Sequence, residues 1–205
     1  MTADIVIVDY GMGNLRSVQK AFEHVGHAAD ITADPARVAT AGKLVVPGIG
    51  AFRDVIGRLR ETGLADAITA HTAAGRPFLG ICLGLQLLFT ESHEDGRHAG
   101  LGVLPGTVVP FPPGRGVKVP HMGWNTLRLT QPDCPLFAGL PPEPAVYFVH
   151  GYYAEPADAT MTAATADHPT PVCAAVWRGN VFATQFHPEK SQDVGLRMLK
   201  NFAGL

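Results

Sequence analysis

Two patterns of hydrophobic residues alternate along the first half of the chain. The run Ile5-Val6-Ile7-Val8 is continuously apolar, which predicts a strand buried on both faces. Leu15, Val18, Phe22 and Val25 then recur at helical spacing until Gly26 ends the pattern. The same reading predicts strands at 4–9, 28–32, 43–46 and 77–81, and helices at 15–25, 52–74 and 83–89. Strands that alternate with helices imply a parallel sheet.

The second half of the chain has a different pattern. Short β-like runs at 107–111, 125–129, 146–153, 161–166, 172–178 and 181–186 are separated by Pro- and Gly-rich turns. Arg178-Gly179-Asn180 is typical of a hairpin turn, and a closing helix is expected at 193–202. We therefore expect an α/β fold with one mixed, mostly parallel central sheet flanked by helices, and a β-rich C-terminal half. With no internal repeat or linker, residues 1–205 are expected to form a single domain, although the length also allows two.

Composition and charge narrow the range of functions. The chain is 46% hydrophobic and 17% charged, and its formal charge of −2 gives no attractive field for nucleic acid or an anionic membrane. No basic leader precedes the first strand, and no apolar run approaches the roughly 20 residues that a bilayer requires, so a cytoplasmic location is expected. Three cysteines without a Cys-x-x-Cys pair argue against a disulfide framework or a zinc site. We expect neither a metal nor a cofactor.

Cys82 lies where an apolar strand meets the next predicted helix, flanked by Gly80 and Gly84. A sharp strand-to-helix turn exposes one side chain, and flanking glycines remove the side chains that would collide with it. The helix that follows would favour the thiolate over the thiol. By itself such a cysteine is more often an inert core residue, so the hypothesis of a nucleophile depends on a base elsewhere in the chain.

His187 is the best candidate for that base among the nine histidines, because it directly follows a predicted strand. A free cysteine has a pKa of about 8.5 and needs a neighbouring imidazole to take or pair with its proton. Glu189 is two residues further on, where an extended segment would place it on the same side as the imidazole. Strand ends gather at the active sites of α/β sheets, so we expect Cys82 to meet this pair.

The turn Pro47-Gly48-Ile49-Gly50 follows another core strand but does not match a phosphate-binding loop. It can supply a backbone N–H, from Ile49 or Gly50, close to that of Leu83. Two such donors form an oxyanion hole, in which one donor is typically worth about 2.7–4 kcal/mol in the transition state.

Together these three motifs resemble the signature of the class I glutamine amidotransferases, in the same order along the chain. Segments 8–15, 120–125 and 147–153 further resemble the glutaminase subunits of imidazole glycerol phosphate synthase, and the likeness covers nearly the whole chain. It implies hydrolysis of L-glutamine to glutamate and ammonia through a thioester on Cys82, with His187 as base and then acid and Glu189 orienting it. It also implies a heterodimer with a separate cyclase, a (β/α)8 barrel that makes imidazole glycerol phosphate and AICAR in histidine biosynthesis.

The resemblance also assigns binding roles. Gln86 and Glu94 match positions that hold glutamine, and His150, Gly151 and Tyr152 match a segment that binds its α-carboxylate end through backbone groups. A serine usually stands where this chain has Gly151. The residues expected to lie toward the cyclase are Asn14, Met122, Trp124 and Asn125.

Simpler interpretations remain open at this stage. His150 could merely satisfy a backbone carbonyl, Glu94 could belong to a solvated loop, and Trp124 could be a core residue. The chain could also be a different cysteine hydrolase, a non-catalytic subunit of the same fold, or a related amidotransferase that serves another pathway.

Overall fold

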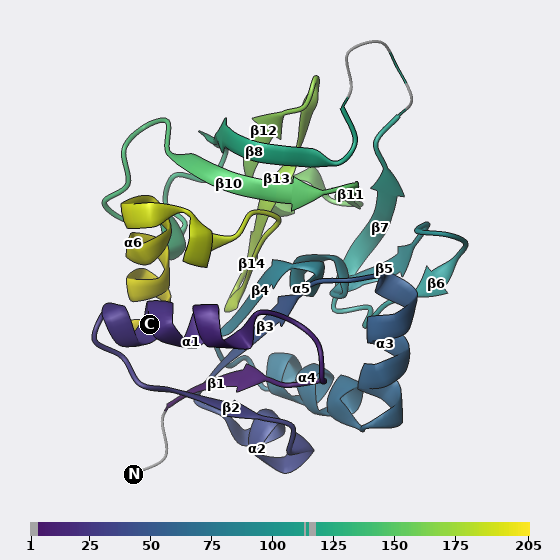
Figure 1. The fold of residues 1–205 in the computed structure, drawn as a ribbon, viewed down its shortest axis with the longest axis vertical. Coiled ribbons are helices and arrows are strands. Elements are labelled where there is room, and N and C mark those ends of the chain that lie inside the picture. The colour runs from purple at the N-terminus through teal and green to yellow at the C-terminus, as the bar shows by residue number, and fades with distance from the viewer. Residues whose placement is uncertain (1–3, 113, 115–117) are drawn as a thin grey trace.

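The computed structural model describes residues 4–112, 114 and 118–205, and Figure 1 shows their arrangement. The helices are α1 (Leu15–His24), α2 (Pro35–Thr40), α3 (Phe52–Glu61), α4 (Leu64–Ala73), α5 (Leu83–Gln86) and α6 (Gln192–Ala203), with 3₁₀ turns η1 (Pro135–Phe137), η2 (Ala159–Met161) and η3 (Pro188–Lys190). The strands are β1 (Ile5–Val8), β2 (Ala29–Thr32), β3 (Lys43–Gly48), β4 (Phe78–Cys82), β5 (Phe89–Ser92), β6 (His98–Ala99), β7 (Leu104–Pro110), β8 (His121–Thr126), β9 (Arg128–Leu129), β10 (Ala145–His150), β11 (Tyr152–Pro156), β12 (Thr162–Asp167), β13 (Pro171–Arg178) and β14 (Val181–Thr184).

The main sheet has eight strands in the order β2-β1-β3-β4-β14-β13-β12-β9. The first five are parallel and the last three pair antiparallel, so the predicted mixed α/β sheet is confirmed. The expectation of one sheet alone is wrong. β10 pairs with β8 in a two-stranded sheet, and β11-β7-β5-β6 form a four-stranded one. The predicted hairpin is confirmed, since Arg178 pairs with Val181 across its turn.

Both faces of the main sheet are covered, which explains the continuous apolar run in β1. Ile5 and Ile7 pack with α1, α6 and β10 on one face, and Val6 and Val8 pack with α2, α3 and α4 on the other. In Figure 1, α1 and α6 lie side by side at one flank, away from α3 and α4. A parallel sheet buried on both faces needs no polar alternation.

Four predicted elements differ from the structure. The strand expected at 125–129 falls across the end of β8 and the whole of β9. The helix expected at 52–74 is two helices, α3 and α4, because Gly63 adopts a left-handed φ of 73° between them. The helix expected at 83–89 ends after one turn, and Phe89 begins strand β5. The strand expected at 146–153 is interrupted at Gly151, where β10 on one side of the main sheet gives way to β11 on the other.

Helix α2 was not expected, although Asp34 and Pro35 are typical of the start of a helix. The Asp34 carboxylate accepts the N–H of Ala36 as an N-cap, and Pro35 occupies the first turn. In the described part of the chain, every helix is too short or too polar to cross a membrane.

The register of β14 against β4 positions the site. The two strands are parallel neighbours, with Ala183 beside Gly80 and Thr184 beside Ile81. Their carboxyl ends therefore deliver Cys82 and the segment 185–189 to the same edge of the sheet.

Candidate active site

Cys82 ends β4 in a strained backbone conformation. Its φ of 56° and ψ of −110° are unusual for a residue with a side chain, and such strain typically costs about 1–3 kcal/mol. Close packing of glycines makes the turn possible, since a Cβ on Gly80 would lie 2.7 Å from the Gly84 carbonyl oxygen. A Cβ on Gly48 would lie 2.6 Å from Cβ of Leu83. The observed geometry is that of a displayed nucleophile.

The His187 imidazole is anchored by Glu189. Its Nδ1 lies 2.8 Å from Oε1 of Glu189, and the two side chains are only 4% and 3% exposed. Glu189 reaches the ring from the 3₁₀ turn η3 and not from an extended segment, so the predicted pairing is present with a different local geometry. Ser191 fixes the backbone, because its hydroxyl donates to the His187 carbonyl at 2.7 Å and accepts the Tyr147 N–H at 3.0 Å.

Cys82 and Glu189 both act on the protonation of His187. Burial alone would lower the pKa of His187, but the interactions with the Cys82 thiol and the Glu189 carboxylate outweigh it and raise that pKa to about 9. The protonated ring is therefore favoured at neutral pH, which suits a thiolate–imidazolium pair. Because Nδ1 faces Glu189, Nε2 is the nitrogen left to exchange a proton with sulfur.

A cleft of about 290 Å³ opens over the sulfur. Its lining includes every residue predicted to act on or bind the substrate apart from Glu189: Ile49, Gly50, Cys82, Leu83, Gln86, Glu94, His150, Gly151, Tyr152 and His187. The structure therefore gathers residues from the loop after β3, the end of β4, α5, the β5–β6 loop, the β10–β11 junction and the segment after β14 around one sulfur atom.

The two predicted backbone donors of the oxyanion hole have different surroundings in this structure. Leu83 is the first residue of α5, so its N–H has no acceptor within the helix. On the other side, the buried Tyr10 hydroxyl supports the turn that carries Ile49, because it donates to the Pro47 carbonyl at 2.8 Å. Burial raises the pKa of Tyr10, so this hydroxyl stays protonated.

Glu94 and Gly151 each have a specific place in the cleft. Oε2 of Glu94 accepts the Phe52 N–H at 2.8 Å, so this carboxylate is held at the start of α3 and is not part of a freely solvated loop. Gly151 has room for a side chain, since a Cβ there would lie 3.6 Å from Cγ1 of Val119. The usual serine would fit, and neither space nor backbone angle requires glycine here.

The residues predicted to face a partner divide into two groups. Met122 and Trp124 project from the same side of β8 and are 60% and 51% exposed, and Asn14 is exposed at the start of α1. The Asn125 side chain is turned the other way, with its Nδ2 2.8 Å from the Asp167 carbonyl and 3.2 Å from Nε2 of His121. Alternation along the strand separates these two faces.

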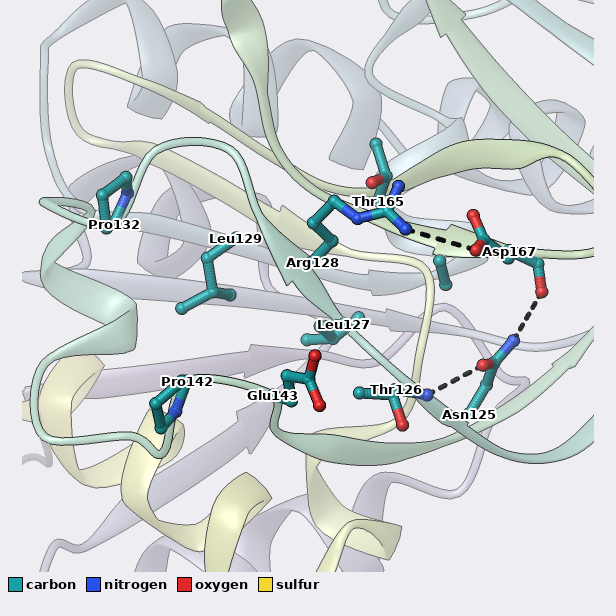
Figure 2. Close-up of a pocket in the computed structure, with 11 residues that line it drawn as sticks. Asn125, Thr126, Leu127, Arg128, Leu129, Pro132, Pro142, Glu143, Thr165 and Asp167 are labelled. Atoms are coloured by element: carbon teal, nitrogen blue, oxygen red, sulfur yellow. Dashed lines mark hydrogen bonds and ion pairs between the residues drawn. The ribbon is translucent and has the colours of Figure 1, made fainter.

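A larger hollow of about 630 Å³ lies beside β9 and β12 (Figure 2). Arg128 in its wall is paired with Asp167 at 3.4 Å, and no cysteine or histidine lines it. The chemistry therefore belongs to the smaller cleft. Within the described ranges, no group of three or more His, Cys, Asp or Glu side chains is arranged to hold a metal ion.

Comparison with known proteins identifies the family. Residues 6–204 match the family model described as glutamine amidotransferase class-I. The chain belongs to the class I glutamine amidotransferases. The solved structure entitled "Structure of PurLQS from Thermotoga maritima" has a TM-score of 0.78 at 19% identity over 100% of this chain and 99% of that one. A second, entitled "Crystal structure of glutamine amidotransferase", has a TM-score of 0.75 at 24% identity, over 98% and 99%. At these identities the likeness supports the amidotransferase fold alone.

Relatives within the amidotransferase family are much closer in sequence. Proteins named imidazole glycerol phosphate synthase subunit HisH are 61% identical in Syntrophotalea carbinolica and 54% identical in Geobacter metallireducens. The alignments cover 98% of this chain in both cases, and 100% and 98% of the relatives.

Several residues of this amidotransferase site were not expected from the sequence. Tyr10, His121, Gln185 and Ser191 are buried around the cleft and bond to its members. Ser191 follows His187 and Glu189 closely enough in sequence to have been a candidate. Tyr10 and His121 lie within segments 8–15 and 120–125, which carry the family resemblance, but the sequence assigned neither a role in the cleft. Gln185 has no distinctive spacing, since its role arises only when β4 and β14 meet in space.

The Glu189→Gln variant is expected to lower the pKa of His187 by roughly 1–2 units. Losing the carboxylate removes a charge and a strong hydrogen bond that both favour the imidazolium. NMR titration of the histidine ring protons would measure the change, with a His187→Gln variant identifying the resonance. As a control, Glu91→Gln removes the carboxylate of another His–Glu pair, formed with His93 at 2.8 Å, and should leave the His187 titration unchanged. An unshifted His187 in Glu189→Gln would contradict the assignment.

Proposed function

We propose that this chain hydrolyses L-glutamine to L-glutamate and ammonia by covalent catalysis on Cys82. The observation that carries the proposal is the strained cysteine beside a buried His187–Glu189 pair in one cleft. The thiolate attacks the side-chain amide carbon, and His187 protonates the departing ammonia. His187 then activates a water molecule that hydrolyses the glutamyl thioester, which restores the thiol.

The remaining residues of the cleft bind the substrate and the transition state. The Leu83 N–H, with Ile49 or Gly50 as second donor, holds the oxyanion. The Glu94 carboxylate attracts the ammonium group of glutamine, and Gln86 lines the wall beside the reacting amide. Backbone groups of His150, Gly151 and Tyr152 hold the α-carboxylate end. Residues 1–205 act together as one glutaminase domain.

Ammonia made here is consumed by a second chain in a heterodimer. Relatives that match almost end to end are named as subunits of imidazole glycerol phosphate synthase, which supports a cyclase partner, a (β/α)8 barrel that makes imidazole glycerol phosphate and AICAR. Exposed Met122 and Trp124 support a docking surface on β8, since Met and Trp are enriched in interfaces. Asn14, exposed at the start of α1, faces the same partner, while Asn125 supports β8 from the inner side of the strand.

The lone chain is expected to hydrolyse glutamine slowly, and to gain at least about fivefold in rate when the barrel partner and its acceptor substrate are added. Glutamate release measures the rate, and co-purification of the two chains measures assembly. A Met122→Asp/Trp124→Asp variant should lose both the stimulation and the co-purification. Leu205→Asp, at an exposed hydrophobic residue that is 43% accessible outside this surface, is the matched control and should behave as wild type. An equally high rate for the lone chain would remove the coupling from the proposal.

A further inference from the structure

Gln185 contacts the nucleophile directly, yet it belongs to none of the sequence motifs. The side chain is fully buried directly after β14, and its Nε2 lies 3.7 Å from Sγ of Cys82. A second neighbour of the sulfur is the Val149 carbonyl oxygen, at 4.0 Å. The first contact offers an N–H donor to sulfur, and the second offers an acceptor for the thiol proton.

Hydrogen bonds behind Gln185 determine which end of its amide faces the sulfur. Nε2 of Gln86 donates to the Tyr152 carbonyl at 3.1 Å, which only the NH₂ end of that side chain can do. The same NH₂ group lies 3.0 Å from Oε1 of Gln185. Since Oε1 accepts from Gln86, the NH₂ group of Gln185 is the end directed at Cys82.

The chain of bonds continues away from the sulfur with one consistent set of proton positions. Nδ1 of His150 donates to the Tyr152 carbonyl at 2.8 Å, so its Nε2 accepts from Nδ1 of His121 at 3.0 Å. Nε2 of His121 accepts in turn from Asn125 at 3.2 Å. Burial lowers the pKa of His150 to about 3 and that of His121 to about 4, which keeps both rings neutral. Each N–H group in this network has one acceptor. A rotation of the Gln185 amide by half a turn would therefore break its hydrogen bond with Gln86.

A side-chain donor matters here because, apart from the His187 imidazolium, the other sources of stabilisation for the thiolate are weak. Helix α5 has only four residues, so it adds little macrodipole at Cys82. The Val149 oxygen stabilises the thiol and repels a thiolate. An amide N–H has the opposite effect, because a hydrogen bond to the charged form of an acid favours ionisation.

We propose that Gln185 is a further catalytic residue of this site, whose Nε2–H donates to Cys82 Sγ and stabilises the thiolate that attacks glutamine. Gln86 orients this donor through Oε1 of Gln185, which gives Gln86 a second role besides lining the cleft. The proposal rests on the proposed glutaminase function, but its principal test does not require turnover.

The test is the pH dependence of Cys82 alkylation by iodoacetamide, followed by mass spectrometry of the intact, folded chain. Gln185→Met keeps the length of the side chain and removes the donor. The midpoint of the alkylation profile is expected to rise by about one pH unit, and kcat/KM for glutamine is expected to fall about tenfold. Cys134 and Cys173 do not interfere, because burial raises the pKa of these thiols to about 11 and about 12.

Gln131→Met is the matched control, because it removes an amide that donates to the Thr160 carbonyl at 2.7 Å, in a loop outside the cleft. It should leave the alkylation profile and kcat/KM unchanged. If Gln185→Met does not fold, Gln185→Glu is the second variant, and its carboxylate should raise the midpoint at least as far. A folded Gln185 variant with the wild-type alkylation profile would overturn the proposal. Loss of glutamine turnover in the wild type, with the shift still present in Gln185→Met, would instead count against the proposed function alone.

Discussion

Cys82→Ala is expected to reduce glutamine hydrolysis by at least about 10⁴-fold, measured as glutamate release from the assembled enzyme. Neither His187 nor the backbone donors can replace the sulfur, because the reaction passes through a covalent bond to it. The fold should be retained, since the contacts of the sulfur with Gln185 and Val149 are long, at 3.7 and 4.0 Å. The melting temperature is therefore expected to stay close to that of the wild type, because the sulfur borders the cleft and its loss leaves no enclosed cavity.

Cys134→Ala provides the matched comparison for Cys82→Ala. This thiol is also buried, in the segment before η1, and does not line the cleft. Its loss should cost some stability through an unfilled space, with the rate per folded molecule unchanged. Residual glutamine hydrolysis in Cys82→Ala comparable to that in Cys134→Ala would refute covalent catalysis at residue 82.

Gly84→Ala is expected to cause the largest loss of stability of any single methyl group added near the site. A Cβ at this position would overlap the Val46 carbonyl oxygen, a backbone atom of β3 that cannot move without disturbing the sheet. We expect a loss of more than about 3 kcal/mol in the free energy of unfolding and a displaced α5 with little activity. Chemical denaturation monitored by circular dichroism measures the first effect.

Gly57→Ala adds the same methyl group where nothing lies within 4 Å, in the interior of α3. Because glycine is a poor helix residue, this variant should be more stable than wild type by about 0.5–1 kcal/mol. The pair separates the general effect of glycine replacement from the steric effect at the nucleophile turn. Equal stability of the two variants would show that close packing of α5 against β3 is not required.

The hydrophobic pattern predicts the elements of this fold better than their ends. Continuous apolar strands and the spacing in α1 are strong signals because burial on two faces leaves no room for polar residues. The break at Gly63 is poorly encoded, since glycine within a helical pattern is compatible with either a continuous helix or a turn. The early end of α5 is hard to predict from the sequence for another reason. Leu83 to Phe89 are apolar apart from Gly84 and Gln86, and so short a run suits a buried helix or a buried strand equally well.

A residue of the site can be predicted from the sequence when its neighbours along the chain form a recognisable pattern. Cys82 and His187 stand at strand ends with distinctive neighbours, and the structure brings both to one cleft. Gln185 lies in an apolar segment where a buried amide gives no periodic signal. Its significance depends on Gln86 and Tyr152, which are distant in sequence and meet it only in the folded chain.

The position of β14 within the main sheet has a consequence for synthesis of the protein. This strand is synthesised after all the other strands of the main sheet, yet it occupies an interior place between β4 and β13. Until β14 emerges, the edge of β4 that faces away from β3 is apolar and unpaired. Such an edge can associate with other chains, and we expect chaperones to bind it during synthesis. Because His187 follows the same strand, a nascent or truncated chain also has no base for its cysteine. The unfinished chain therefore cannot hydrolyse glutamine, and Cys82 becomes reactive only after β14 has joined the sheet.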